Sequence, residues 1–181
     1  MNHPAVCVFC GSSPGSRPEY REAAISLGRW LASHDVGLVY GGTHVGLMGA
    51  VADACLAGGG CVVGVIPDSL AERELAHQGL TELIRVDSMH ERKAEMAARA
   101  TVFVALPGAL GTLDELCEIL TWTQLGFHSK PVGLLNVSGY YDSFLSFLDH
   151  TVVEGFLRQS NRDRLIVAAS VGDLLPVITS K

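Results

Sequence analysis

The chain has 181 residues, of which 48% are hydrophobic and 18% are charged. This length predicts a single domain spanning residues 1–181, and so apolar a composition excludes a disordered or fibrous chain. The formal net charge of −6, without a basic tract, argues against a nucleic acid polymer as partner, because its phosphates must be met by Lys and Arg. Glycine is the outlier at 20 residues, which indicates sharp turns or close approach of the backbone to a ligand.

No targeting or membrane segment is predicted. Residues 1–4 lack a basic region and a cleavage site, and glycines interrupt the uncharged stretch 36–52. Cys7 and Cys10 form a C-x-x-C inside a strand-like run, so we expect buried strand cysteines rather than a redox pair. A cytoplasmic, soluble protein is the expectation.

Short apolar runs alternate with helical patterns along the chain. Strands are predicted at residues 5–10, 36–40, 61–66, 83–86, 101–106, 132–135 and 165–168. Helices are predicted at residues 18–34, 47–57, 89–100, 113–125 and 140–154. Because most of the apolar runs are continuous, the strands should be buried on both faces. The pattern predicts an α/β fold, a Rossmann-like three-layer sandwich with a parallel sheet flanked by helices.

Ligands of such sheets bind beyond the carboxyl ends of the strands. The loops expected there are residues 11–16, 41–46, 67–79 and 107–112, and three of these four are rich in glycine. The first loop does not match the dinucleotide fingerprint, which argues against NAD or FAD. In the second, Gly41 and Gly42 allow the backbone to approach a ligand, while Gly46 and Gly49 allow close helix packing; packing alone is the alternative.

The predicted helix at residues 89–100 carries Arg92 on one face with Met89 and Met96. Since burying an unpaired charge is costly, Arg92 must meet an anion, either a ligand or a structural carboxylate. Ser88 and Glu91 have the spacing of a capping box, which assigns Glu91 to the helix start. The neighbouring histidine, His90, is expected on the surface or a pocket rim rather than on a metal.

Residues 106–115 (LPGALGTLDE) form the strongest local feature, a strand followed by a glycine turn and a helix start. The first N–H groups of a helix lack intrahelical acceptors, so the backbone from Gly108 to Thr112 is a candidate phosphate site without lysine. A tight turn is the alternative. Thr112 and Glu115 also fit a capping box, which leaves Glu115 open between a cap and a catalytic carboxylate. Glu115 shares a second helix face with Ile119 and Trp122, which suggests that something else covers this face, a partner subunit being one candidate.

These segments resemble the Lonely Guy (LOG) family of cytokinin-activating phosphoribohydrolases, long labelled possible lysine decarboxylases. The resemblance covers residues 5 to about 173 and is carried, in order, by residues 9–13 (FCGSS), 41–42, 46–49 (GLMG), 89–93 (MHERK), 107–115, 121–126 (TWTQLG) and 130–136 (KPVGLLN). It implies a Rossmann-like fold, a homodimer, and hydrolysis of the N-glycosidic bond of N6-modified adenosine 5′-monophosphates. No metal or redox cofactor is implied.

The resemblance implies that Arg92 and Glu115 are catalytic. The substrate contacts that it implies are Glu74, Lys93, Ala109, Leu110, Gly111, Thr112, Leu113, Asp114 and Thr121. Gly42 and Gly108, from the glycine loops, complete the set of candidate binding residues. Ala109 stands where the family motif has its second glycine. Alanine would strain the loop if this position required a positive φ, and would be tolerated if it required only a small residue. We expect the second.

Two other functions compete with the hydrolase. Decarboxylation with pyridoxal phosphate needs a Schiff-base lysine, and we see none set up for that role among Lys93, Lys130 and Lys181. A non-catalytic nucleotide sensor on the same fold would keep the glycine loops but could lose Arg92 or Glu115. Because both residues are present, the hydrolase is favoured.

Overall fold

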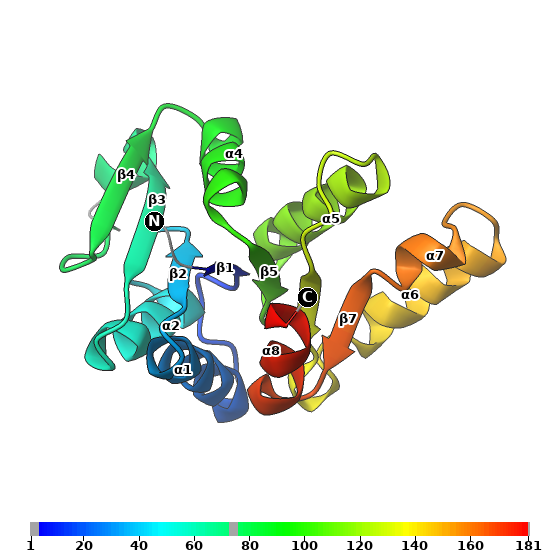
Figure 1. Ribbon diagram of the computed structural model, residues 1–181, viewed down its shortest axis with the longest axis horizontal. Coiled ribbons are helices and arrows are strands. Elements are labelled where there is room, and N and C mark those ends of the chain that lie inside the picture. The colour runs from blue at the N-terminus through cyan, green and yellow to red at the C-terminus, as the bar shows by residue number, and fades with distance from the viewer. Residues whose placement is uncertain (1–3, 73–75, 181) are drawn as a thin grey trace.

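The computed structural model describes residues 4–72 and 76–180, and their strands form one seven-stranded sheet (Figure 1). Every pair of neighbouring strands is parallel, in the order β4-β3-β2-β1-β5-β6-β7. The strands are β1 (Ala5–Phe9), β2 (Gly37–Tyr40), β3 (Val62–Pro67), β4 (Glu82–Val86), β5 (Val102–Ala105), β6 (Val132–Leu135) and β7 (Leu165–Ala168). The predicted α/β class with a parallel sheet is confirmed.

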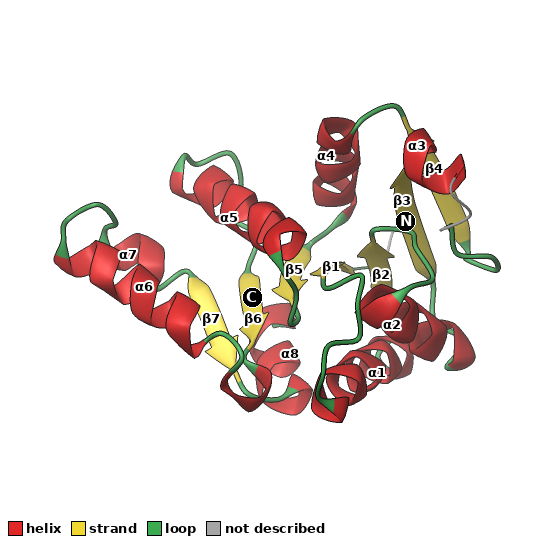
Figure 2. Cartoon of the chain, turned by 180° about the vertical axis from the view of Figure 1, so that it is seen from behind, coloured by secondary structure: helices red, strands yellow, loops and turns green. Residues whose placement is uncertain are grey.

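Helices cover both faces of this sheet (Figure 2). One layer contains α1 (Pro18–Ser33), α2 (Gly46–Ala57) and α8 (Val171–Thr179). The other contains α4 (Met89–Arg99), α5 (Leu110–Gln124) and α6 (Asp142–Val153). Short helical segments in the connections include α3 (Asp68–Leu70), η2 (Val137–Gly139) and α7 (Gln159–Arg162).

The core divides into two clusters because successive strand side chains point to opposite faces of the sheet. In β1, Val6 and Val8 join the cluster under α1, α2 and α8, whereas Cys7 and Phe9 join the cluster under α4, α5 and α6. Cys10 joins the first cluster and Cys7 the second, and both are buried and free. The prediction that the C-x-x-C consists of buried strand cysteines is confirmed.

Most predicted helices agree with the structure to within two residues at each end, and the larger differences concern α5 and α8. Helix α5 begins at Leu110 rather than at residue 113, so the glycine turn runs directly into its first turn. Helix α8 was not predicted, and it continues through Pro176. The side chain of Ser170 accepts a hydrogen bond from the backbone N–H of Asp173 (3.2 Å) and caps its start, and Leu174 is fully buried. Capping and burial thus hold a helix in which proline removes one hydrogen bond.

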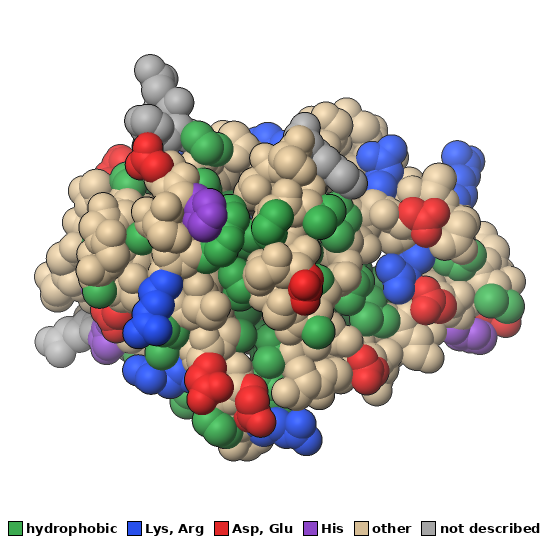
Figure 3. Space-filling model, turned by 60° about the horizontal axis from the view of Figure 1, so that its bottom comes forward, with side chains coloured by type: hydrophobic (Ala, Val, Ile, Leu, Met, Phe, Trp, Pro, Cys, Tyr) green, Lys and Arg blue, Asp and Glu red, His purple; other side chains and the backbone are tan. Residues whose placement is uncertain are grey.

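The strand order reverses at β1, since β2, β3 and β4 extend to one side of it and β5, β6 and β7 to the other. The crevice between the carboxyl ends of β1 and β5 is therefore where a ligand is expected. Within residues 4–72 and 76–180, every helix is too short or too polar to cross a bilayer. On the face in Figure 3, Lys and Arg side chains are scattered among Asp and Glu rather than gathered in one stripe.

Candidate active site

A cavity of about 310 Å³ opens at the carboxyl ends of β1, β2 and β5, where the strand order reverses. Its lining comes from the loop after β1, from Gly41 after β2, from the start of α4 and from the β5–α5 turn. This volume is of the size that small-molecule sites have. Three of the four predicted strand-end loops therefore meet at one cavity.

The turn from β5 into α5 forms one wall. Its N-cap is Ala109, and the first intrahelical hydrogen bond runs from the N–H of Leu113 to the carbonyl of Ala109 (3.1 Å). The N–H groups of Leu110, Gly111 and Thr112 come before this bond, so the helix itself offers them no acceptor. Gly111 and Thr112 line the cavity. Together with the positive end of the helix dipole, this geometry suits an anion such as a phosphate.

Ala109 and Gly108 meet different demands in this turn. Ala109 is exposed and has a φ of −100°, so the position does not require a left-handed backbone. The expectation that alanine is tolerated here is confirmed. A Cβ atom on Gly108, by contrast, would overlap Oγ1 of Thr112. Gly108 is therefore needed for the close approach between the turn and the helix.

Hydrogen bonds donated to three consecutive backbone carbonyls hold the turn in place. The hydroxyl of Tyr141 donates to the carbonyl of Leu106 (2.7 Å), and that of Tyr140 donates to the carbonyl of Gly108 (2.7 Å). The N–H of Gly11, in the loop after β1, donates to the carbonyl of Pro107 (3.0 Å). The wall that would hold the anion is thus fixed from two sides before any ligand binds.

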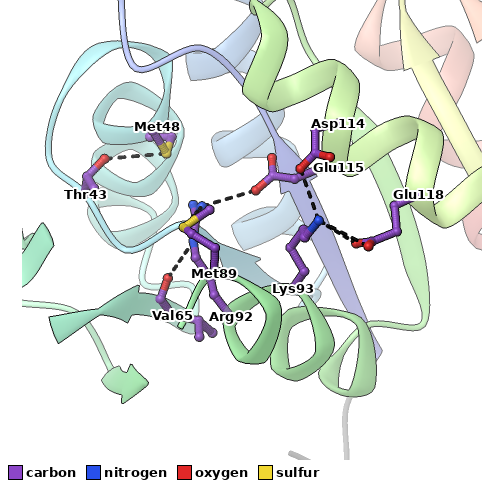
Figure 4. A network of polar contacts seen from close by, with 9 residues as sticks. All are labelled: Thr43, Met48, Val65, Met89, Arg92, Lys93, Asp114, Glu115 and Glu118. Carbon is purple, nitrogen blue, oxygen red and sulfur yellow. Dashed lines mark hydrogen bonds and ion pairs between the residues drawn. The ribbon is translucent and has the colours of Figure 1, made fainter. Parts of the chain in front are cut away.

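Arg92 and Glu115 meet at the cavity (Figure 4). Nη1 of Arg92 lies 3.3 Å from Oε1 of Glu115, and Nε of Arg92 donates to the carbonyl of Val65 in β3 (3.2 Å). Only 8% of Arg92 and 7% of Glu115 is exposed. The prediction that Arg92 must meet an anion is confirmed, and its partner is the other residue singled out for chemistry.

Burial raises the pKa of Glu115 to about 7, with the guanidinium of Arg92 opposing the rise and the charge of Asp114 adding to it. A carboxyl group with a pKa near neutrality can take up or release a proton at physiological pH. The site thus contains a titratable carboxyl group beside a fixed positive charge.

The structure contains the capping box at the start of α4 but not the one left open at the start of α5. The N-cap of α5 is Ala109, with no side-chain cap, so Thr112 and Glu115 do not form a capping box. At the start of α4, the side chain of Ser88 accepts a hydrogen bond from the N–H of Glu91 (3.1 Å), as the spacing predicted. Glu115 is therefore free for the cavity.

Comparison with known proteins agrees with this geometry. Residues 48–178 match the model of the family described as "Possible lysine decarboxylase". The chain is 54% identical over 170 residues to probable cytokinin riboside 5′-monophosphate phosphoribohydrolase LOGL9 of Oryza sativa subsp. japonica, covering 94% of this chain and 75% of that protein. It is 56% identical over 164 residues to cytokinin riboside 5′-monophosphate phosphoribohydrolase LOG7 of Arabidopsis thaliana, covering 91% of this chain and 75% of that protein. The chain belongs to the LOG family.

Solved structures with this fold include the molybdenum cofactor binding protein of Rippkaea orientalis, with a TM-score of 0.75, 22% identity, and coverage of 99% of this chain and 98% of that one. The structure titled TM1055 gives a TM-score of 0.75 at 24% identity, and coverage of 98% and 99%. At these identities the likeness supports the fold alone. It agrees with the Rossmann-like architecture expected of a LOG protein.

Not every residue that the LOG resemblance assigned to substrate lines the cavity. Lys93 instead contacts the carboxylates of Asp114 and Glu118, each at 3.1 Å, and links α4 to α5. Thr121 is exposed on α5, where its hydroxyl donates to the carbonyl of Cys117 (2.7 Å). Glu74 lies outside the described residues.

Three further predicted contacts depend on the backbone or on packing. The side chain of Leu110 is 83% exposed and, like that of Leu113, is not part of the cavity wall, so these residues could contact a ligand there only through the backbone. Gly42 has a φ of +76°, and a Cβ atom there would lie 3.1 Å from Cβ of Ile66. Gly42 therefore serves the packing of the loop on β3, the alternative left open for it.

The prediction of a partner-covered face on α5 is wrong in its residues. Ile119 is 3% exposed and belongs to the core under α4, α5 and α6, and Trp122 packs against the same core. The exposed side of α5 carries Cys117 and Thr121 instead. The reason is that the sheet and its neighbouring helices already cover this face of α5, with Leu116 and Ile119 both inward.

Sequence reasoning missed several residues that line the cavity. Ser12 and Ser13 belong to the loop after β1, and Met48 is on α2 with its sulfur near the hydroxyl of Thr43 (3.5 Å). Tyr140 comes from the segment after β6 and carried no local signal. His90 is exposed, and within the described residues no group of three or more His, Cys, Asp and Glu side chains is arranged to hold a metal.

Proposed function

We propose that this LOG protein hydrolyses the N-glycosidic bond of N6-modified adenosine 5′-monophosphates, releasing a cytokinin-type free base and ribose 5-phosphate. The observation that carries the proposal is the buried Arg92–Glu115 pair, at 3.3 Å, in a cavity whose wall is the N-terminus of α5. The relatives are named for this activity on cytokinin riboside 5′-monophosphates.

The phosphate would bind the first N–H groups of α5. Gly111 and Glu115 are one helical turn apart, which corresponds to about 6 Å along the axis at about 1.5 Å per residue. This separation matches the span of a ribose between its 5′-phosphate and its glycosidic carbon. A nucleotide held by its phosphate at Gly111 and Thr112 would therefore bring that carbon to Glu115. Backbone groups supply the positive potential, which suits a chain of net charge −6.

Cleavage of the C1′–N9 bond develops positive charge on the ribose, as in glycoside hydrolysis. The carboxylate of Glu115 would stabilise this charge and orient a water molecule, from which it accepts a proton as the oxygen adds to C1′. The electron pair of the broken bond leaves with the base, which takes up a proton. The guanidinium of Arg92 would hold the substrate and stabilise the negative charge that develops on the leaving base.

The two competing functions receive less support. Within the described residues no lysine lines the cavity, since Lys93 is paired with carboxylates and Lys130 donates to the carbonyl of Ala97 (2.8 Å). A pyridoxal-dependent decarboxylase would need such a lysine. A non-catalytic sensor would not need the buried Arg92–Glu115 pair, and burying two charges costs free energy of desolvation that a catalytic role would explain.

The deciding experiment is a hydrolysis assay with N6-isopentenyladenosine monophosphate, AMP, GMP and CMP, following free base by chromatography. We expect release of base from the adenine nucleotides. Tight binding of AMP without release would favour the sensor, and a pyridoxal absorption band in the purified protein would favour the decarboxylase.

We further propose a homodimer formed through the side of α5 and α6 that faces away from the sheet, called the α5–α6 face. Helix α6 has no buried residue although it is rich in apolar side chains. Phe147 is 59% exposed and Phe156, just beyond α6, is 87% exposed. In Figure 1, α5 and α6 both lie on the side of β5 that carries β6 and β7. Apolar surface of this kind marks a protein interface, and Thr121 would lie in it.

Light scattering after gel filtration would test the dimer. Phe147→Asp is expected to give monomers, because it places a charge in the interface. Val177→Asp, at a 46% exposed position on α8 in the opposite layer, is the matched control and should stay dimeric. A monomeric wild type would contradict the proposal. Cys7, Cys10 and Cys55 are buried thiols outside any disulfide, which supports a reducing, cytoplasmic location.

A further inference from the structure

Gly41 lies where β2 meets the Arg92–Glu115 pair. It directly follows Tyr40, the last residue of β2, and lines the cavity. A Cβ atom at this position would overlap Nη2 of Arg92 and would lie 2.9 Å from the sulfur of Met48. The guanidinium therefore occupies the space that any side chain at position 41 would need.

The need for glycine at this position is steric and not conformational. Gly41 is not among the glycines with positive φ, whereas its neighbour Gly42 has a φ of +76°. The three heavy atoms nearest to a Cβ on Gly41 all belong to the side chains of Arg92 and Met48. The backbone would accept alanine, so the cost of a methyl group falls on these two side chains. Met48 is flexible and can turn its sulfur away.

Arg92 has little freedom to move away. Its Nε donates to the carbonyl of Val65 (3.2 Å), its Nη1 lies 3.3 Å from Glu115, and Nη1 is also 3.8 Å from the sulfur of Met89 (Figure 4). These groups belong to β3, α5 and α4, and Gly41 adds contact from the end of β2. A methyl group at position 41 would displace Nη2 of Arg92. Because the guanidinium is rigid and planar, this would also rotate Nε and Nη1 away from Val65 and Glu115.

We infer that Gly41 is a positioning residue for Arg92: its missing side chain lets the guanidinium lie against the end of β2 and aim Nη1 at Glu115. This inference rests on the proposed function only in that Arg92 acts on the substrate. It assigns Gly41 to the arginine, whereas the sequence pattern offered only close approach to a ligand or packing.

Kinetics of Gly41→Ala with AMP as the probe test this inference. A displacement of about 1 Å in a reacting group can cost on the order of a hundredfold in rate, so we expect kcat to fall by about tenfold or more. Gly172→Ala on α8 is the matched control, since the atom nearest to its new Cβ would be 3.9 Å away. The control should keep the wild-type kcat. A wild-type kcat in Gly41→Ala would overturn the inference.

A double-mutant cycle with Arg92→Ala separates positioning from general damage to the fold. Once the guanidinium is gone, adding Gly41→Ala should lower neither the residual rate nor the midpoint of thermal unfolding. Equal losses of midpoint in the two backgrounds would show that the methyl group disturbs something other than Arg92 and would overturn the inference. If the wild type hydrolyses no nucleotide, the proposed function fails, while the midpoints still decide the role of Gly41.

Discussion

The turns after β2 and β5 look alike in sequence, each a strand that runs into glycines and then a helix, yet their glycines have different roles. In the β5–α5 turn, Gly108, Gly111 and the helix start face the cavity. In the β2–α2 turn, a Cβ atom on Gly46 would overlap the backbone of Ser12, and one on Gly49 would overlap the carbonyl of His44. The first turn presents its backbone to the cavity, and at Gly46 and Gly49 the second is filled by the protein's own chain.

The difference comes from what lies opposite each turn. At Gly111 the β5–α5 turn faces open space, with nothing within 4 Å of a Cβ atom built there. Beyond the β2–α2 turn lies the loop after β1, whose Gly11 carbonyl accepts a hydrogen bond from the N–H of Leu47 (3.0 Å). A glycine pattern after a strand thus indicates close approach of something, and only the neighbouring elements decide whether that is ligand or chain.

Glu115→Gln tests most strongly whether the chemistry belongs to the β5–α5 side. Removing a general base costs about a hundredfold or more in kcat, so release of base from AMP should be almost abolished. Binding of AMP by calorimetry should be largely kept, because the phosphate contacts remain. Glu118 lies one helical turn further along α5 and pairs with Lys93. The control variant Glu118→Gln should therefore leave turnover intact. Unchanged turnover in Glu115→Gln would remove this residue from the mechanism.

The pH dependence of the rate should follow the same carboxyl group. With a pKa of about 7, Glu115 is protonated below neutrality in the free enzyme, so kcat/KM should fall about tenfold per unit there and level off above it. Because the charge of Arg92 lowers this pKa, Arg92→Ala should move the inflection to higher pH. A profile that stays flat between about pH 5 and 9 would contradict a titrating Glu115.

Gly46→Ala should damage stability instead of chemistry, as expected for the β2–α2 turn. Gly46 has a φ of +60°, and its new Cβ would overlap the backbone of Ser12. We expect a loss of about 2 kcal/mol or more in the free energy of unfolding in urea. Gly59→Ala, with a φ of +79° and nothing within 4 Å, carries the backbone strain without the overlap and should lose less. Equal losses would mean that the close packing contributes nothing.

Gly111→Ala should have the smallest effect, and it should weaken substrate binding rather than stability. Alanine replaces glycine in the first turn of α5 without meeting any atom within 4 Å, so stability should stay equal or rise by roughly 0.5–1 kcal/mol. The methyl group enters the cavity where the phosphate would bind, so KM for AMP should rise severalfold. An unchanged KM would place the phosphate elsewhere.

Local sequence patterns were enough to predict the parallel sheet, five of the helices and the need of Arg92 for an anion. Continuous apolar runs indicate strands buried on both faces, and a charge on an apolar stripe requires a partner wherever it lies. The glycine turn before Glu115 was likewise visible as a strand end followed by a helix. These features depend on neighbours in the chain, which the sequence displays directly.

The tertiary structure alone decided which element each residue meets. Arg92 could have paired with any carboxylate, and it is the packing of α4 and α5 over the same sheet that brings Glu115 to it. The same packing moved Lys93 out of the cavity and turned Ile119 into the core. It also placed Gly41 against the guanidinium of Arg92, and Tyr140 beside the β5–α5 turn. The spacing of apolar residues along a helix predicts that one of its faces is covered. Which element covers that face depends on the order of the strands in the sheet.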